Sequence, residues 1–512
     1  MPEIFRTDFD GYNIEIRKKI NGEDASLYGA FSQSAFLTLS LLVPRALGVT
    51  EVKITVQNDE ENGSVTEKTL EFATLEREND VFETSLDLSS LCGCEKSGLF
   101  WYYFTFYRKK DVPVLFSDAV NNLEVRLSEE KGKPYRLLVY EDGFDTPEYF
   151  RGGVMYHIFV DRFAKGDFVP PKRDDAVMND DWYGGIPQYG EYPGAFVANN
   201  MFFGGNLVGV REKLGYLSSL GVTVIYLSPV GKAYSNHKYD TGDYMTVDEM
   251  FGGEKALANL IAEAKKYGIR IILDGVFNHT GDDSRYFNKY GKYDSVGAYQ
   301  SEKSPYYGWY KFTEFPDKYE SWWGIPILPK LNLENEECAS FLAKGETSVV
   351  GKYVKMGIGG IRLDVADELP DEFLEELRAT AKTLSGGDAV IIGEVWENAS
   401  DKVAYGKRRK YLRGRQLDSV MNYPFRTAVI EFLLHKNARA MADELTEIYA
   451  SYPKCVSDSL MNIIGTHDTE RILTVLSGEN KYDLPNEKLA RVRMSDESRE
   501  RAKRLLKLAA VT

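Results

Sequence analysis

Three short acidic blocks are the chemically most informative feature of this 512-residue chain. They read Gly360–Asp364, Gly393–Trp396 and Gly465–Asp468, and each follows or closes an apolar stretch rich in β-branched residues. Such stretches predict strands, so each block ends a strand with a carboxylate. In a (β/α)8 barrel, catalytic side chains gather at the C-terminal strand ends. Carboxylates that converge there indicate chemistry on sugar bonds, and the three are Asp364, Glu394 and Asp468.

The residue types predict a separate role for each carboxylate. Arg362 lies two residues before Asp364, so both side chains share one face of the strand, and a guanidinium there stabilises an ionised nucleophile. Glu394, at the next strand end, is the predicted general acid/base. Asp468, beside His467, is predicted to hold sugar hydroxyls. The alternative is that these residues only form surface ion pairs at strand ends. That alternative accounts well for a single Arg-x-Asp motif but poorly for all the blocks taken together.

The chain around these blocks alternates short apolar strands with helices that end at glycine. Residues 222–227, 269–273 and the helix 254–267 before Gly268 are clear examples. This rhythm predicts an α/β fold, a (β/α)8 TIM barrel over residues 151–512. Strands are predicted near residues 154, 222, 269, 358, 390, 417 and 461. The chain ends just after a basic helix, so we expect a barrel truncated before or within its last strand.

Two further regions interrupt or precede the barrel pattern. Residues 1–150 contain short β-rich runs separated by polar turns, which predicts an N-terminal antiparallel β-sandwich. Residues about 280–330 form a Tyr- and Trp-rich stretch that follows the third strand and is too long for an ordinary loop. We therefore expect a small inserted subdomain that caps the barrel.

The composition excludes several classes of protein. A net charge of −15 argues against binding of nucleic acid or an anionic membrane and is compatible with a neutral polysaccharide. No apolar run is long enough for a transmembrane helix, and the N-terminus lacks the pattern of a signal peptide. Four cysteines without a metal-ligand pattern indicate thiols in a reducing, cytoplasmic compartment. A secreted form from which the signal has been removed stays open.

A fourth block, Asp274–His279, closes the third strand, and the order of all four blocks resembles the signature regions of the alpha-amylase family, glycoside hydrolase family 13. Three more stretches resemble the neopullulanase and cyclomaltodextrinase branch of that family: Ser235–Tyr244, Leu328–Asn332 and Asp418–Tyr423. The resemblance covers about residues 150–510. The leading β-rich region also looks like the sandwich that precedes the barrel in this branch, with starch binding as its expected role.

The resemblance implies the same catalytic roles for Asp364, Glu394 and Asp468, the last as transition-state stabiliser. It also implies that Tyr239 stacks on the sugar at the cleaved bond. The expected substrate-binding set is His237, Tyr239, Asp274, His279, Arg362, His467 and Trp323, the last as a stacking platform or as core. His157, where the family often has Gln, is interpreted as structural.

The implied activity is hydrolysis of α-1,4 and perhaps α-1,6 glucosidic bonds in maltodextrins, cyclodextrins, pullulan or starch. It would proceed with retention through a covalent glycosyl-enzyme intermediate, and transfer to a sugar hydroxyl is a variant. The alternative is a catalytically silent carbohydrate-binding protein or inactive fragment. Intact Asp364, Glu394 and Asp468 argue against it.

Some positions depart from the family pattern. At position 367, directly before Glu368, this chain has Asp where the neopullulanase branch tends to carry Asn. No cofactor is required; calcium stays open, with Asp167 as a weak candidate because Ca²⁺ takes six to eight oxygen ligands. From the resemblance we expect the family's C-terminal β-domain to be missing from residues 1–512, and we expect a homodimer through the N-terminal domain.

Overall fold

The computed structural model describes residues 14–60, 63–109, 112–119, 124–190, 192, 195–478 and 495–509, which form two compact units. The first, called here the sandwich unit, joins Met1–Asp145 to Glu397–Arg415 and His435–Asp458. The second, the barrel unit, contains Thr146–Trp396, Gln416–Leu434 and Ser459–Thr512. The extreme ends, on which the expectations about a leader and a truncated barrel rest, lie outside the described residues.

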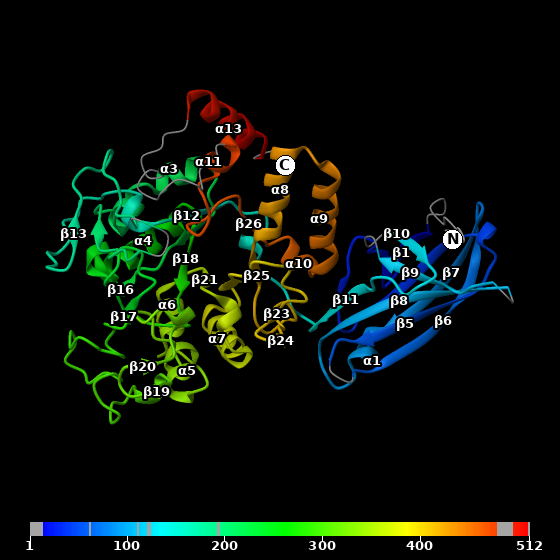
Figure 1. Ribbon diagram of the computed structural model, residues 1–512, viewed down its shortest axis with the longest axis horizontal. Helices are drawn as coiled ribbons and strands as arrows, with labels where there is room; N and C mark the ends of the chain where they lie inside the picture. The colour runs from blue at the N-terminus through cyan, green and yellow to red at the C-terminus, as the bar shows by residue number, and fades with distance from the viewer. Residues whose placement is uncertain are drawn as a thin grey trace, which may run out of the picture. The chain divides into compact units, whose positions relative to one another are not determined.

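A parallel sheet forms the centre of the barrel unit (Figure 1). Its order follows the chain, and its strands are β12 (Met155–Ile158), β15 (Val224–Leu227), β18 (Arg270–Gly275), β21 (Gly360–Leu363), β22 (Val390–Gly393), β25 (Ser419–Asn422) and β26 (Met461–Asn462). All seven predicted strands are thus present within the described ranges, and the sheet has the order of a nearly closed barrel. Most of these strands are buried along their whole length, as strands covered on both faces must be.

Helices follow the strands of this sheet along the chain. They are α2 (Leu207–Glu212), α3 (Leu214–Ser219), α4 (Gly253–Lys266), α5 (Glu336–Ala343), α6 (Val349–Met356), α7 (Asp371–Ser385), α8 (Tyr423–His435), α11 (Ile472–Ser477) and α13 (Asp496–Ala509). The last two of them, α11 and α13, come after β26. Helix α7 shows why they form. Asp371 and Glu372 lie in its first turn, Phe373, Leu374 and Leu377 recur on one buried face, and Gly386 ends it at φ 65°.

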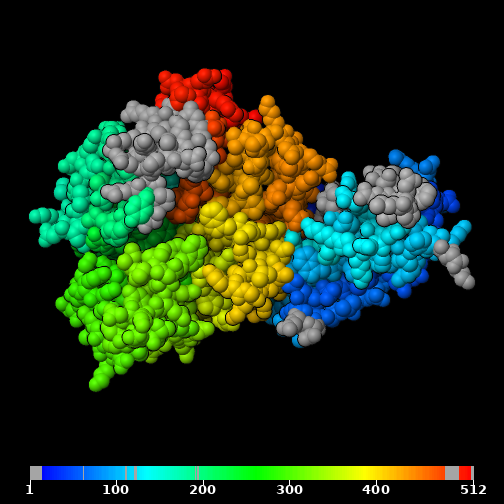
Figure 2. Space-filling model, in the orientation of Figure 1, coloured from blue at the N-terminus to red at the C-terminus, as the bar shows by residue number. Residues whose placement is uncertain are grey.

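The predicted insertion after β18 contains little regular structure. It holds the short strands β19 (Phe312–Glu314) and β20 (Lys318–Tyr319) and the 3-10 turns η5 (Tyr307–Trp309) and η6 (Trp322–Gly324). Aromatic packing stabilises it: Phe287 contacts Tyr310 and Tyr319 edge-on, with ring centroids 4.9 and 4.7 Å apart. Its surface is bright green in Figure 2.

The sandwich unit confirms the β-rich N-terminal region. Its strands are β1 (Ile14–Ile20), β2 (Glu23–Asp24), β3 (Ala30–Ser32), β4 (Phe36–Pro44), β5 (Val49–Asn58), β6 (Val65–Glu76), β7 (Asn79–Asp87), β8 (Gly98–Arg108), β9 (Leu115–Ala119), β10 (Glu124–Ser128) and β11 (Tyr135–Tyr140). Pairing is antiparallel except between β3 and β11, and β8 pairs with β5, β9 and β11. Alternate residues of these strands, including Phe104 and Phe106, fill one core.

Two later stretches of the chain complete the sandwich unit. They carry the short hairpin of β23 (Val403–Ala404) and β24 (Lys407–Arg408), and the helices α9 (Ala438–Ser451) and α10 (Lys454–Ser457). They come from the connections β22–β25 and β25–β26. No motif in the sequence predicted this grouping. All four cysteines are free, and no helix in the described ranges is long and apolar enough to cross a membrane.

Candidate active site

Arg362 is the centre of the predicted site and is completely buried in β21. One of its terminal nitrogens, Nη1, lies 3.0 Å from both Asp274 Oδ1 and Asp364 Oδ1, and Nη2 lies 2.9 Å from Glu394 Oε2. The strand register explains this convergence. Asp274 pairs with Arg362 across β18 and β21, and Asp364 and Glu394 each follow directly after the paired ends of β21 and β22. Three neighbouring strands therefore bring three carboxylates to one guanidinium.

Burial disfavours the charged form of the Asp364 carboxyl. Burial, the largest effect, raises the pKa of the Asp364 carboxyl well above its usual range, Arg362 lowers this pKa, and the Asp274 and Glu394 charges raise it. The cation expected to keep Asp364 ionised is thus in contact with it but does not outweigh burial. Asp364 is 7% exposed, so its carboxylate can lose its remaining water when a ligand binds.

Glu394 is held by three donors. Its Oε2 accepts a hydrogen bond of 2.8 Å from the backbone N–H of Val365 and contacts Arg362, while its Oε1 accepts one of 3.1 Å from Trp396 Nε1. The Trp396 indole stacks on Tyr423 with ring centroids 3.8 Å apart. Val365 adopts φ 41° and ψ 55°, which is unfavourable for a β-branched residue. The strained residue therefore directly follows Asp364 in the chain and donates a hydrogen bond to Glu394.

Asp468 follows β26 and is more accessible, with its side chain 37% exposed. Its Oδ2 lies 3.2 Å from His467 Nε2, which is 2.7 Å from the Tyr239 hydroxyl. Tyr239 also donates to Asp274 Oδ2 at 2.8 Å and stacks on His467 with centroids 5.2 Å apart. Asp468, His467, Tyr239 and Asp274 thus form a continuous polar chain that ends at Arg362.

Two more predicted histidines lie beside aromatic rings. His279 stacks on Trp322 with centroids 5.2 Å apart, and Trp322 stacks on Trp323 at 5.1 Å. Trp323 is 78% exposed, so it lies on the surface and is not part of the core. Burial lowers the pKa of His279 to about 4, which keeps the imidazole neutral at ordinary pH. His237 accepts from the Tyr239 backbone N–H at 3.1 Å, and burial lowers its pKa too.

His157, interpreted as structural, lies in the same group of side chains. Its ring stacks on Tyr226 with centroids 4.6 Å apart and lies 5.3 Å from the His467 ring. Its Nε2 is 2.9 Å from Ser228 Oγ, and burial lowers its pKa to about 4. The Tyr226 hydroxyl donates to Asp274. The signal that could have indicated His157 is its place in β12, the first strand, whose end meets the others.

Four further residues near the site were not singled out from the sequence: Trp396, Tyr423, Tyr226 and Lys330. Lys330 Nζ lies 2.7 Å from Glu368 Oε2, which joins the resembling stretch Leu328–Asn332 to the turn after Asp364. Among the described residues, the buried nitrogens Trp322 Nε1 and His467 Nδ1 lack a hydrogen-bond partner. The Trp322 indole N–H can only donate, whereas His467 Nδ1 can donate or accept according to its tautomer.

Asp167 does not fit a calcium ion. Its side chain is exposed, and its backbone N–H donates to Glu212 Oε1 at 3.3 Å. Within the described ranges, no three His, Cys, Asp or Glu side chains meet in a metal-binding cluster, at Asp167 or elsewhere. Calcium coordination needs several oxygen ligands around one point, and a lone carboxylate does not supply them.

The chain is similar to known proteins over most of its length. Residues 157–496 match the family model described as alpha amylase, catalytic domain. An amylopullulanase of Thermoanaerobacterium saccharolyticum is 36% identical over 464 residues, covering 80% of this chain and 34% of that protein. Neopullulanase 2 of Thermoactinomyces vulgaris is 36% identical over 381 residues, covering 72% of this chain and 59% of the relative. The chain thus spans between a third and three fifths of the length of these relatives.

A solved structure of a cyclomaltodextrinase supports the same assignment at the level of fold. It covers 89% of this chain and 72% of its own, with a TM-score of 0.59 and 27% identity. The match includes more of the chain than the catalytic-domain model, and both agree with a (β/α)8 barrel. The β-rich region lies before the residues that the family model matches. The seven resembling stretches identified in the sequence, the carboxylates gathered on Arg362 and these similarities lead to one conclusion. The chain belongs to the alpha-amylase family.

Proposed function

We propose that the protein is a retaining α-glucan hydrolase that cleaves α-1,4 glucosidic bonds, and α-1,6 bonds as well, in maltodextrins, cyclodextrins, pullulan or starch. The observation that carries the proposal is the contact of Asp274, Asp364 and Glu394 with one buried guanidinium. A shared cation keeps the nucleophile and the acid close together, which retention requires. The relatives, named amylopullulanase and neopullulanase, support the choice of glucan.

In the first step, an Asp364 oxygen attacks the anomeric carbon as the glycosidic bond breaks. Protonated Glu394 transfers its proton to the leaving oxygen, so the released sugar is neutral and Glu394 becomes a carboxylate. In the second step Glu394 takes a proton from water, whose oxygen displaces Asp364 from the anomeric carbon. A sugar hydroxyl in place of water gives transglycosylation. Both steps use groups of the chain and the substrates alone.

The remaining residues are proposed to hold the sugar at the cleaved bond. Asp468 is exposed enough to accept hydrogen bonds from sugar hydroxyls, and His467 fixes its orientation. Neutral His279 can donate to or accept from hydroxyls without a charge that must be desolvated. Trp323 offers an exposed indole face to a sugar further along the chain. Tyr239 is stacked on His467, so we assign it a positioning as well as a contact role.

The proposal is tested with γ-cyclodextrin, pullulan and soluble starch, whose released sugars identify the bond that is cut. Glu394→Gln should lower turnover by a factor on the order of 10²–10⁴, because it removes proton transfer. Glu346→Gln is the matched control, since Glu346 is an exposed glutamate paired with Lys355. Binding without turnover in the parent and in Glu394→Gln alike would favour the silent carbohydrate-binding protein.

We also propose, from the resemblance alone, that two copies associate through the N-terminal region. Such a dimer would restrict the cleft to short or cyclic glucans. Sedimentation equilibrium of the full chain tests this: a dimer supports it, and a monomer at all concentrations up to those used in the assay contradicts it.

A further inference from the structure

The two carboxyl oxygens of Glu394 have different surroundings, and all the groups that surround them belong to the barrel unit. Oε2 accepts a hydrogen bond of 2.8 Å from the Val365 backbone N–H and lies 2.9 Å from Arg362 Nη2. Oε1 accepts one hydrogen bond, of 3.1 Å, from Trp396 Nε1. A proton on Oε2 would have to share that oxygen with two groups that can only donate. Of the two oxygens, Oε1 is therefore the one with room for a proton.

The indole that donates to Oε1 is held in place by a second aromatic ring. Trp396 stacks on Tyr423 with ring centroids 3.8 Å apart and an angle of 10° between the ring planes. Tyr423 follows β25 directly, is 3% exposed and packs in the same core cluster as Val390 and Ile392 of β22. A ring packed in such a core cannot shift without repacking its neighbours. The strand that leads to Glu394 and the ring that supports Trp396 thus share one rigid core.

A fixed donor on Oε1 restricts the rotation of the Glu394 carboxyl. We propose that Trp396 is a positioning residue for Glu394: its N–H holds the carboxyl so that the proton on Oε1 is directed at the leaving oxygen. This inference rests on the proposed function. The indole keeps its own proton throughout. In the first step the proton of Oε1 moves to the leaving oxygen, and in the second step Oε1 takes a proton from water while the indole N–H still stabilises the carboxylate.

Two substrates with nearly the same aglycone test this role in the full chain: phenyl α-maltoside and 4-nitrophenyl α-maltoside. Phenoxide is the poorer leaving group, so its departure depends more strongly on a proton from the acid. Trp396→Phe keeps an aromatic ring against Tyr423 but removes the N–H. It should lower kcat/KM for phenyl α-maltoside roughly ten- to a hundredfold, the worth of one hydrogen bond to a charged group. For 4-nitrophenyl α-maltoside, kcat/KM should change little.

The same chemical change at another tryptophan supplies the matched control. Trp309, in the insertion after β18, is buried, and its indole nitrogen has no hydrogen-bond partner among the described residues. Trp309→Phe should therefore leave the ratio of the two kcat/KM values at that of the parent. Replacement of Trp396 by benzothienylalanine is the second variant, should Trp396→Phe fail to fold. It keeps two fused rings and has a sulfur where the N–H was, so it should show the same selective loss.

The ratio of the two losses separates a positioning role from the other roles of an indole. Trp396 is 45% exposed, so its ring can also stack on an aglycone, and loss of that contact alone would lower kcat/KM for both substrates equally. Equal losses on both substrates, or none on either, in the folded variants would overturn the inference. Absence of turnover of both substrates by the parent chain would instead contradict the proposed function, so the two failures are distinguishable.

Discussion

At the scale of single residues, the site combines a buried cation with more negative charge than it neutralises. Arg362 faces Asp274, Asp364 and Glu394 at 2.9–3.0 Å, and two of these carboxylates carry the proposed chemistry. Such an arrangement costs folding free energy, because buried like charges repel and lose hydration. Activity and stability should therefore respond in opposite directions when one of the carboxylates is neutralised.

Asp364→Asn should abolish turnover and raise the melting temperature at pH 7 by roughly 1–3 °C. The Asp364 pKa is raised in the folded state, so ionisation destabilises the fold above that pKa, and the cost disappears as the pH falls below it. The gain in melting temperature should accordingly shrink in acid. Calorimetry of both proteins from pH 4 to pH 8 measures this, and a lower melting temperature of Asp364→Asn at pH 7 would contradict the assignment.

The pH dependence of kcat/KM offers a second check on Asp364. The nucleophile must be ionised, so activity should fall as the pH decreases through its raised pKa, and the acidic limb should lie above the ordinary aspartate value of 3.8. His157 and His279, with pKa values of about 4, stay neutral and should add no step near pH 6.5. An acidic limb at or below the ordinary aspartate value would show that Arg362 outweighs burial.

At the scale of elements, strand ends and short turns determine where each group lies. The turn η6 presents Trp323 at φ 50° on the surface, while its neighbour Trp322 packs on His279. Trp323→Ala should raise KM for maltotetraose about tenfold, from the loss of one stacking contact, and leave the melting temperature unchanged. Tyr183→Ala is the control, because Tyr183 is 98% exposed in the same unit. Equal KM values for Trp323→Ala and Tyr183→Ala would show that Trp323 does not contact the substrate.

The approach of helix α9 to the sandwich strands depends on a glycine. A Cβ at Gly29 would clash with the backbone carbonyl oxygen of Ala450, which cannot move as a side chain would. Gly29→Ala should therefore destabilise the sandwich unit by about 1–3 kcal/mol in chemical denaturation. Gly215→Ala in α3 is the control, since the nearest atom to its added Cβ is 4.0 Å away. A Gly29→Ala variant as stable as the parent would show that this close approach does not form.

The elements differ in how well the sequence predicted them. The seven parallel strands and the β-rich start were predictable because β-branched runs, glycine stops and alternation are local signals. The acid blocks were predictable because parallel strands place their ends at one edge. The stack of Trp396 on Tyr423 and the position of His157 between Tyr226 and His467 were not, since both depend on side-chain packing between segments far apart in the chain.

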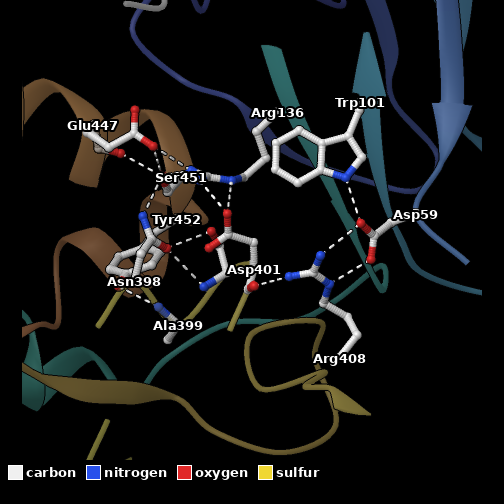
Figure 3. Close-up of polar contacts among 11 residues, drawn as sticks. Asp59, Trp101, Arg136, Asn398, Ala399, Asp401, Arg408, Glu447, Ser451 and Tyr452 are labelled. Carbon is white, nitrogen blue, oxygen red and sulfur yellow. Dashed lines mark hydrogen bonds and ion pairs between the residues drawn. The ribbon is translucent and has the colours of Figure 1, made fainter. Parts of the chain in front are cut away.

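At the scale of the whole molecule, the sandwich unit is built from three separate stretches of the chain. The first 145 residues share that unit with the connections that follow β22 and β25, so they should not fold or unfold apart from those connections. Deletion of residues 1–145 should leave Asp401, Glu447 and Tyr452 without Arg136 and its neighbours (Figure 3), and the shortened chain should lose cooperative unfolding and turnover. A shortened chain with full activity would contradict this account.

The measurement that tests the central claim most directly is peptide mass spectrometry of Glu394→Gln after reaction with α-maltosyl fluoride. Fluoride departs without an acid, but the second step lacks its base, so a covalent glycosyl-enzyme should accumulate. The account predicts a maltosyl adduct on the peptide that contains Asp364. Release of fluoride with the adduct on another residue, or with no adduct at all, would contradict it.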